Sequence, residues 1–436
     1  MRHALWCLGI LSLAVASSPS VALEVTVSQD GGGDYTSIQV AIDAVEPGDI
    51  VTVYPGTYRG QIDFLGKDIT VRSSAGAAST AITNPLGSCA TFHSGETAAA
   101  ALIGFTLRDG TGTLHNDTRR GGAIFCLRSS PRIEGCVFER NFAHYAAAIY
   151  VELCDSVILD CRFIGNTCIM DGGAIAGPSS RVEIYGCYFE QNTSLDGYGT
   201  IHLGADSPIE DCVFVNNQAM AGGAISTAGI GADYSIRRCT FIDNDATSDG
   251  GAIRVHRAQP TIEDCLFVDN SATYDGGAIL CINSSAPVIR HCTFDHNDAG
   301  RNGGNLTFLS FSVPTLENCI VAGAVRNGGL YCADGARAAM GCNDFWMNAR
   351  GNYGGDCPDV TGIDGNIAED PLWCGPPNDY GIASTSACAP AHSEGCDLIG
   401  AFDVACTPPV PVEEQSWGGV KAKFRFGRVG SAGAGR

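Results

Sequence analysis

Cysteine recurs along this chain every 23 to 27 residues, and this spacing limits the fold more than any other feature of the sequence. Each of these cysteines follows an aliphatic or similar apolar residue by three positions, and in most copies Phe stands two positions after it and Asn five after it. The cysteines are Cys136, Cys161, Cys187, Cys212, Cys239, Cys265, Cys292, Cys319 and Cys342. The asparagines are Asn141, Asn166, Asn192, Asn217, Asn244, Asn270 and Asn297. A unit this short cannot bury its apolar face alone, so the repeat predicts a solenoid with one shared core.

A second motif, Gly-Gly-Ala-Ile, keeps the same period. Its intact copies are Gly121–Ile124, Gly172–Ile175, Gly222–Ile225, Gly250–Ile253 and Gly276–Ile279. Apolar residues alternate within each unit, as Ile253 and Val255 do, which indicates strands, whereas the spacing of three between Ile133 and Cys136 indicates a corner. Short strands joined by tight corners and wound in one sense predict an all-β chain that forms a right-handed parallel β-helix.

The repeated residues have structural explanations in such a fold. Asn tolerates a left-handed backbone, and its amide can bond to the amides of the coils above and below. The glycine pairs suit turns that need positive φ. We expect the nine ladder cysteines to be largely reduced and buried, because they fall on the apolar pattern and fill space as small hydrophobic side chains do.

The ends of the chain depart from the repeat and divide it into four parts. Residues 1–22 have the charged start, apolar stretch and small-residue end of a signal peptide. Residues 23–345 should form the β-helix, with a short N-terminal capping helix on which Ile38, Ala41, Ile42 and Val45 share one face. Residues 346–407 should form an irregular C-terminal cap, in which Cys357, Cys374, Cys388, Cys396 and Cys406 are the best candidates for disulfides. Residues 408–436 form a Pro-rich linker and a basic, aromatic tail, interpreted equally well as an attachment signal or as a disordered end.

The charge and the hydropathy restrict the partners. A formal net charge of -21 argues against nucleic acid, because phosphate neutralisation needs clustered Lys and Arg. After removal of the signal peptide, no stretch is long and uncharged enough to span a bilayer. We therefore expect a secreted or cell-surface protein whose partners are polysaccharides or cell-surface components.

Several segments resemble known families. Asp34–Gln39, Pro55–Tyr58 and Gly66–Val71 look like the opening of pectin-lyase-like right-handed β-helix proteins, which include the pectinesterases. Gly104–Leu107 resembles one of their early coils, and Gly365–Ile367 with Asp370–Leu372 resembles the closing segment of secreted bacterial β-helix proteins. The Gly-Gly-Ala-Ile and Phe-x-x-Asn motifs are similar to the repeats of polymorphic outer-membrane proteins. The resemblance implies the fold. It carries over no catalytic residue, because the chain departs from the aspartate and arginine motifs of pectinesterases and from those of polygalacturonases.

Two groups of residues outside the ladders are candidates for a site. Asp249 and Asp275 precede glycine pairs on what should be adjacent coils, where they could share Ca²⁺; the alternative, which we favour, is that each caps its own turn. Arg254 and His256 should face outward from one strand, with Arg257 beside them, and such a group could neutralise and deprotonate a uronate. The alternative for these three residues is an ordinary solvated face.

The repeated residues all have structural explanations, so our first hypothesis is an exported, non-catalytic β-helix that presents a surface for adhesion or envelope interactions. The alternative is a carbohydrate-active enzyme, a polysaccharide lyase or a glycoside hydrolase that acts on an acidic polysaccharide. A third hypothesis is a carbohydrate-binding module without turnover. The fold alone cannot choose among them. No cofactor is required by any of these hypotheses, and Ca²⁺ is compatible with each.

Overall fold

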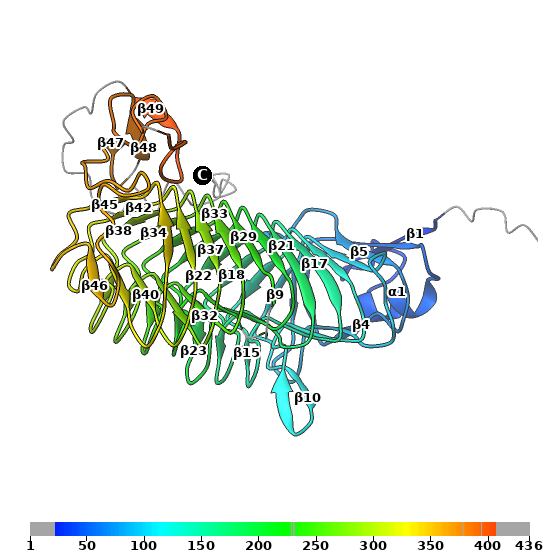
Figure 1. The fold of residues 1–436 in the computed structure, drawn as a ribbon. Coiled ribbons are helices and arrows are strands. Elements are labelled where there is room, and N and C mark those ends of the chain that lie inside the picture. The colour runs from blue at the N-terminus through cyan, green and yellow to red at the C-terminus, as the bar shows by residue number, and fades with distance from the viewer. Residues whose placement is uncertain (1–21, 228, 230–231, 378, 394, 407–436) are drawn as a thin grey trace, which may run out of the picture.

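The computed structural model describes residues 22–227, 229, 232–377, 379–393 and 395–406, and it shows an elongated parallel β-helix (Figure 1). The predicted tail and all but the last residue of the predicted signal peptide lie outside the described residues. In the described part, no helix is long and apolar enough to cross a membrane. The parallel β-helix of the described residues confirms the predicted all-β solenoid.

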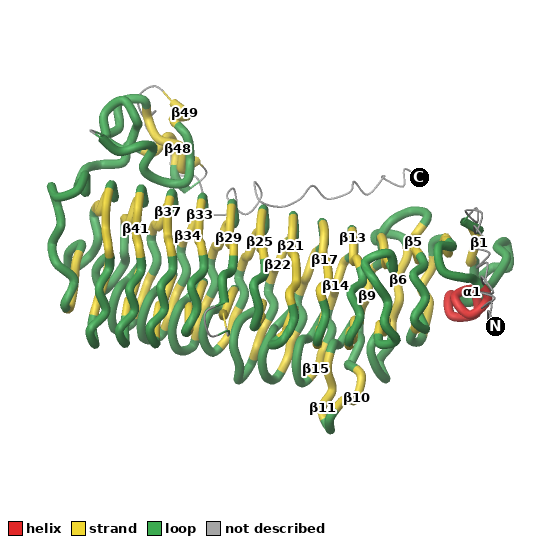
Figure 2. The backbone as a smooth tube through the Cα atoms, turned by 45° about the vertical axis from the view of Figure 1, so that its right-hand side comes forward, coloured by secondary structure: helices red, strands yellow, loops and turns green. Residues whose placement is uncertain are grey.

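Each regular turn has strands on four sides, which belong to sheets C, A and B and to a fourth, short sheet. In one turn these strands are β12 (Ile124–Leu127) of sheet C, β13 (Arg132–Glu134) of sheet A, β14 (Val137–Glu139) of sheet B and β15 (Phe142–Ala143) of the short sheet. The next turn begins with β16 (Ile149–Glu152), which pairs in parallel with β12 so that Ile124 lies opposite Ile149. Identical positions of the repeat therefore stack along the solenoid axis (Figure 2).

Sheet C carries the candidate site, and twelve of its strands lie in the described residues. In spatial order they are β4 (Ile62–Asp63), β7 (Ala90–Phe92), β12, β16, β20 (Ile175–Gly177), β24 (Ile201–Leu203), β28 (Ile225–Thr227), β32 (Ile253–His256), β36 (Ile279–Ile282), β40 (Leu306–Phe308), β43 (Leu330–Cys332) and β46 (Tyr353–Gly355). Sheets A and B run beside it over the same turns, so the outer face of sheet C is one long side of the solenoid.

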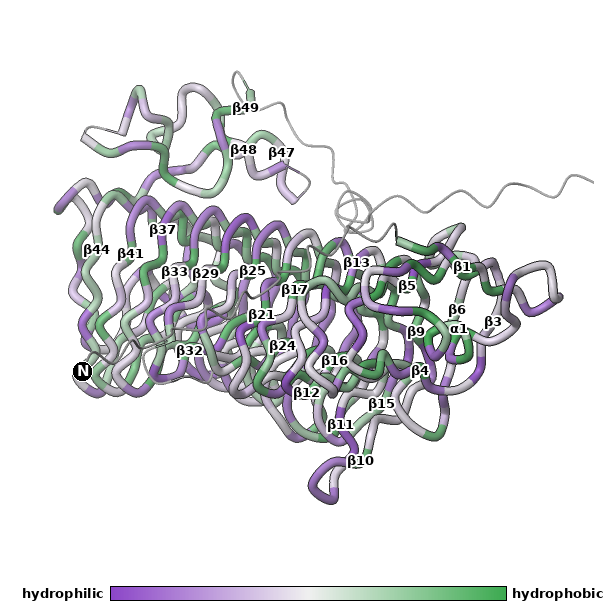
Figure 3. The backbone as a smooth tube through the Cα atoms, turned by 90° about the vertical axis from the view of Figure 1, so that its right-hand side faces the viewer, coloured by the Kyte–Doolittle hydropathy of each residue, from purple (hydrophilic) through white to green (hydrophobic). Residues whose placement is uncertain are grey.

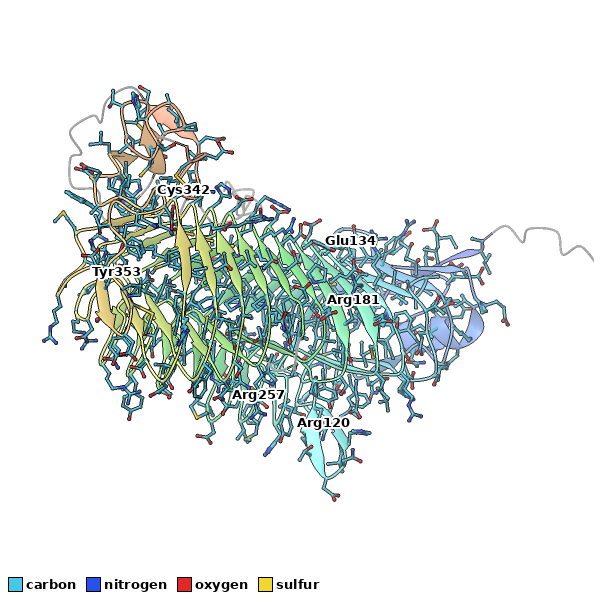
Figure 4. All side chains as sticks on the ribbon, in the orientation of Figure 1. Arg120, Glu134, Arg181, Arg257, Cys342 and Tyr353 are labelled. Atoms are coloured by element: carbon cyan, nitrogen blue, oxygen red, sulfur yellow. A yellow bond between two sulfur atoms is a disulfide. The ribbon has the colours of Figure 1, made fainter. Side chains whose placement is uncertain are left out.

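The interior consists of columns of identical side chains. The rings of Phe138, Phe163 and Phe189 are parallel to within 7°, with centroids 4.6–4.7 Å apart, and the column continues in the same manner to Phe294. The ladder cysteines from Cys136 to Cys319 are buried thiols. The prediction was wrong for Cys342, which forms a disulfide with Cys396 because the C-terminal cap packs against that turn (Figure 4).

The asparagines form a hydrogen-bonded ladder along one corner. The side-chain amide of Asn166 donates to Oδ1 of Asn192 at 2.9 Å and to the carbonyl of Phe138, one turn back, at 3.0 Å. The expectation of a left-handed backbone at these asparagines was wrong, because that conformation falls on the preceding residue, for example Gln191 at φ 56°. The first glycine of each pair does need positive φ: at Gly250 φ is 65°, and a Cβ would lie 2.5 Å from a carbonyl oxygen.

Both ends of the solenoid carry additional structure. The predicted helix α1 (Ile38–Ala44) lies at the first turns, with Ile38, Ala41 and Ile42 buried (Figure 1). The C-terminal segment folds back over the outer face of sheet B through β47 (Trp373–Gly375), β48 (Asp379–Ala383) and β49 (Val404–Cys406). There the hydroxyl of Tyr380 donates to Asp295 at 2.9 Å.

Disulfides hold this segment, as the sequence predicts, but their partners extend into the solenoid. They join Cys332 to Cys357, Cys342 to Cys396 and Cys374 to Cys406, whereas Cys388 is a buried thiol.

Candidate functional site

Two columns of side chains run side by side along the outer face of sheet C. The first consists of the second residue of each strand, which points outward because its neighbours point into the core. The register places in this column Phe125, Tyr150, Ala176, His202, Ser226 and Arg254. The second column consists of the residue before each glycine pair or its equivalent, and it contains Arg120, Tyr145, Asp171, Tyr198 and Ala221.

A cavity of about 230 Å³ lies where these two columns meet. Its lining residues are Arg120, Tyr145, Tyr150, Asp171, Ala176, Pro178 and His202. The space exists because Ala176, a small residue, stands between the large side chains of Tyr150 and His202 in the stacked column. The cavity is therefore a consequence of one small residue in a column of large ones.

A network around Arg120 forms one end of the cavity. Its guanidinium carbon lies 5.3 Å from the ring centre of Tyr145 and 5.0 Å from that of Tyr150, within the range of cation–π attraction. Arg120 also donates to the hydroxyl of Tyr150 and lies 3.4 Å from a carboxylate oxygen of Glu152. Burial, together with a 2.9 Å hydrogen bond donated to Glu152, raises the pKa of Tyr150 to about 12. This phenol therefore keeps its proton at neutral pH.

Arg254 and Tyr198 lie just beyond the other end, next to His202: the ring centres of Tyr198 and His202 are 5.9 Å apart, but neither Arg254 nor Tyr198 lines the cavity. The guanidinium carbon of Arg254, from β32, lies 4.9 Å from the ring centre of Tyr198, which directly precedes the turn into β24. The intervening turn carries the small residues Ala221 and Ser226, which leave room for the long Arg254 side chain to reach back. Burial lowers the pKa of Arg254. No residue that the structure describes lies within ion-pair distance of Arg254, and the carboxylate of Asp249 opposes the lowering of its pKa only from farther away.

His202 lies between these two ends and is only 8% exposed. Its Nδ1 is buried and has no hydrogen-bond partner among the described residues. Burial lowers the pKa of His202; Arg254 lowers it further, and Asp171 opposes this shift. Asp171 is itself held in place, because its Oδ1 accepts a hydrogen bond from the backbone N of Tyr198 at 2.9 Å. The cavity thus contains a neutral imidazole with an unused nitrogen.

The three residues of the predicted exposed face separate in the structure. Arg254 and His256 both point outward from β32, as the alternation predicts, but only Arg254 stacks on Tyr198, whose ring lies 5.9 Å from that of His202. His256 is half-buried, and its pKa is lowered by burial and by the two arginines. Arg257 is exposed in the following turn at φ 55°, on the lower edge of the solenoid in Figure 4.

Asp249 and Asp275 lie on adjacent turns, and Asp249 Oδ1 accepts a 3.2 Å hydrogen bond from the backbone N of Asp275. The carboxylate of Asp275 is bound by the guanidinium of Arg301 and by the side-chain amide of Asn302. In the described part of the chain, no three His, Cys, Asp or Glu side chains are grouped as metal ligands. The calcium site stays a prediction.

The sequence alone predicted no role for Tyr145, Tyr150, Tyr198 or the Arg120 network. Their signal in the sequence is their position: each aligns with the residue just before a glycine pair or with the second residue of the following strand. Reading that signal requires the register of neighbouring turns and the position of Ala176.

Comparisons with known proteins agree with this architecture. The family model described as "Right handed beta helix region" matches residues 122–309, 179–345 and 229–407, which together extend over more than half of the chain. No curated protein matches the sequence. The resemblance to the repeats of polymorphic outer-membrane proteins stays a prediction.

Three solved structures are similar in fold, at low sequence identity. A pectin methylesterase from carrot is 13% identical, with a TM-score of 0.33, over 75% of this chain and 91% of that one. The catalytic unit of an α-1,3-glucanase from Streptomyces thermodiastaticus is 14% identical, with a TM-score of 0.39, over 82% and 71%. A mannuronic acid specific polysaccharide family 6 lyase from human gut microbiota is 13% identical, with a TM-score of 0.31, over 81% and 85%. On the family match, and in accord with the stacked turns described above, this chain belongs to the right-handed β-helix family.

Proposed function

We propose that this protein is an exported enzyme that binds an acidic polysaccharide in the sheet C cavity and cleaves it by β-elimination. One observation carries the proposal. A neutral imidazole with an unused nitrogen, His202, lines a cavity that also contains two tyrosines, and Arg254, a partly buried cation without an ion pair among the described residues, stacks on Tyr198 next to His202. Leaving both groups without partners costs free energy in the free protein, and a ligand would recover it.

The lining suits a sugar. Tyr145 and Tyr150 offer flat apolar faces together with hydroxyl groups, and a few convergent polar groups can fix the orientation of a ligand. At about 230 Å³, the cavity is smaller than the roughly 300 Å³ at which pockets for drug-sized ligands begin. A single sugar residue of a longer chain fits this size better than a large ligand does.

The charges favour a uronate and elimination. In this reaction a base removes the proton from the carbon next to the carboxylate, the electron pair forms a carbon–carbon double bond, and the glycosidic oxygen leaves with a proton. His202 is the neutral base, Arg254 neutralises the carboxylate as charge develops, and the protonated phenol of Tyr150 supplies the proton to the leaving oxygen.

Hydrolysis by a pair of carboxylic acids fits less well. Glu152 forms an ion pair with Arg120 and accepts a hydrogen bond from the hydroxyl of Tyr150. Asp171 accepts a hydrogen bond from the backbone N of Tyr198. Hydrolysis would need one of two carboxyl groups to act as an acid and the other as a base or nucleophile. Elimination needs a base, a cation and a proton donor: His202 Nδ1 has no hydrogen-bond partner and Arg254 no ion pair among the described residues, and Tyr150 keeps its proton at neutral pH.

The disulfides support export. Cys332–Cys357, Cys342–Cys396 and Cys374–Cys406 are typical of an oxidising compartment and accord with the predicted signal peptide. The adhesion role is supported by no contact in the structure and stays a prediction. Binding of polysaccharide without turnover would favour it, or a carbohydrate-binding module, over an enzyme.

The test is an assay of the purified, signal-free protein on a panel of polyuronates, with Ca²⁺ and with a chelator. Elimination creates an unsaturated uronate, which is followed by its ultraviolet absorbance. The proposal predicts product from the wild type and from Glu210→Gln, a variant on the outer face of sheet A, and product formation slower by roughly 10²-fold or more from His202→Gln. Equal rates from wild type and His202→Gln, or no product from any polymer, would reject it.

A further inference from the structure

A β-hairpin stands beside the cavity, and the proposed reaction does not use it. It comprises β10 (Thr113–His115) and β11 (Thr118–Arg120), which pair antiparallel. Its two tip residues, Asn116 and Asp117, are left-handed, with φ of 47° and 60°, as in a tight two-residue hairpin turn. Figure 2 shows that it projects from the side of the solenoid, and Figure 3 shows that its tip is hydrophilic.

The hairpin is anchored at its base. Arg119 donates to the carbonyls of Gly112 at 2.7 Å and of Leu86 at 3.2 Å, and its own carbonyl accepts the backbone N of His144 at 2.8 Å. Arg120 forms a parallel bridge to Tyr145 in the next turn. An isolated two-stranded hairpin is only marginally stable in water, so these contacts make this one a fixed wall of the solenoid.

The wall covers the outer face of β12, the sheet C strand on the N-terminal side of the cavity. Phe125 points outward from β12, yet it is only 4% exposed, and the ring of His115 lies 5.4 Å from it. The Nε2 atom of His115 is also 3.7 Å from the carboxylate of Glu152. The outer face of sheet C is therefore occupied directly beside the Arg120 end of the cavity.

The opposite end is closed less firmly. Beyond His202 the outward column continues with the small Ser226, and the next long side chain is that of Arg254, which stacks on Tyr198. A side chain can change its rotamer, whereas the hairpin is held by backbone hydrogen bonds. A polymer that enters the cavity can extend over β28 and β32 but not over β12.

We propose that the β10–β11 hairpin makes this a chain-end enzyme: the terminal sugar of an acidic polysaccharide abuts Arg120 and Tyr150, and sugar units are removed from that end. This inference rests on the proposed function and adds the mode of attack to it. A cavity with room for one terminal residue against a wall selects chain ends, because an internal segment would have to pass through the space that His115 and Phe125 fill.

The test compares the fall in solution viscosity with the release of unsaturated product from a long polyuronate. For the wild type, we expect small products from the first minutes while the viscosity hardly changes. Replacement of residues 114–118 by Gly-Gly removes the wall but keeps Arg119 and Arg120, and this variant should lower the viscosity early. The control, Asn116→Gly with Asp117→Gly, keeps the length and the turn geometry and should behave as the wild type.

A second measurement does not depend on folding of the shortened variant. The wild type should lose its activity on a polyuronate that is chemically blocked at both ends. Early viscosity loss with the wild type, or undiminished activity on the blocked polymer, would overturn the inference and leave the proposed elimination intact. Absence of product from every polyuronate would instead overturn the proposed function, and this inference with it.

Discussion

The outer faces of sheets A and C are built on the same turns, but the charged side chains on sheet A form ion pairs, whereas Arg254 on sheet C forms none with any described residue. On sheet A, Arg181 pairs with Glu183, and Arg238 pairs with Glu210 at 2.7 Å; Figure 4 shows Arg181 and Glu134 along this face. On sheet C, Arg254 stacks on Tyr198 without an ion pair among the described residues, and His202 keeps an unused nitrogen.

This difference separates a structural surface from a candidate site. The backbone ladder and the inward columns hold each turn, so the outward residues are free to vary. Opposite charges on neighbouring strands satisfy one another in solvent and contribute little more than solubility and a modest stabilisation. Half-buried groups without partners are unfavourable for the free protein, and such groups concentrate where a ligand binds. His202 and Glu210 belong to one turn, so they compare the two faces directly.

The largest effect is expected for His202→Gln, which removes the base and roughly preserves the shape of the side chain. Loss of a general base costs roughly 10²- to 10⁴-fold in rate. We therefore expect kcat on a polyuronate to fall by that range while binding, measured by calorimetry, persists. If this variant turns over substrate at the wild-type rate, His202 is not the base, and the outer face of sheet C would differ from that of sheet A in no catalytic respect.

Arg254→Met should have a smaller effect, mainly on recognition of the carboxylate. A hydrogen bond to a charged group contributes about 1.5–3 kcal/mol, which corresponds to roughly 10- to 100-fold in kcat/KM. Stacking on Tyr198 is retained by the long apolar side chain, so the melting temperature should change little. Steady-state kinetics on a uronate polymer and on its methyl ester would sharpen the assignment, since the ester should not distinguish the variant from the wild type.

The pH dependence should report His202. The neutral imidazole is the active form, and burial lowers its pKa, so the rate should fall as the pH is lowered, with a midpoint below the ordinary histidine pKa of about 6.5. Arg254→Met removes a cation that contributes to this shift, so the acid limb of kcat/KM should move to higher pH in that variant. If the acid limb does not move in this variant, Arg254 does not influence the pKa of His202.

The smallest effect is expected on sheet A. Glu210→Gln removes the ion pair to Arg238, whose side chain is 47% exposed, and exposed pairs contribute about 0–1 kcal/mol. Chemical denaturation should show a loss of stability below about 1 kcal/mol that vanishes at high salt, and the activity should be unchanged. A large loss of activity in this variant would contradict the division of labour between the two faces.

The fold was predictable because the same sequence pattern recurs in many successive turns. The period of Cys136, Phe138 and Asn141 predicts the stacked turns, and one deviating copy among many does not obscure it. Cys342 shows the limit of such a prediction: it follows the spacing of the ladder, yet it forms a disulfide with Cys396, 54 residues away. That contact depends on how the C-terminal segment folds back over sheet B, which no local pattern encodes.

The site was predictable only in part. Arg254 stood out because it faces outward beside another basic residue, but the predicted group of Arg254, His256 and Arg257 does not line the cavity, and of the three only Arg254 stacks on Tyr198. The residues it meets, Tyr198 and His202, lie more than 50 positions earlier in the chain, on the second turn before its own. Their proximity depends on the small size of Ala221 and Ser226 in between.

By itself, the sequence determined the architecture of this protein: periodic apolar, aromatic and amide residues can be buried and hydrogen-bonded together only if successive turns stack in register. The tertiary structure alone decided where chemistry is available. The stacking that makes interior columns identical also brings together outward residues that differ from turn to turn. The cavity arises from such a difference, where Ala176 follows Tyr150 and precedes His202 in one outward column.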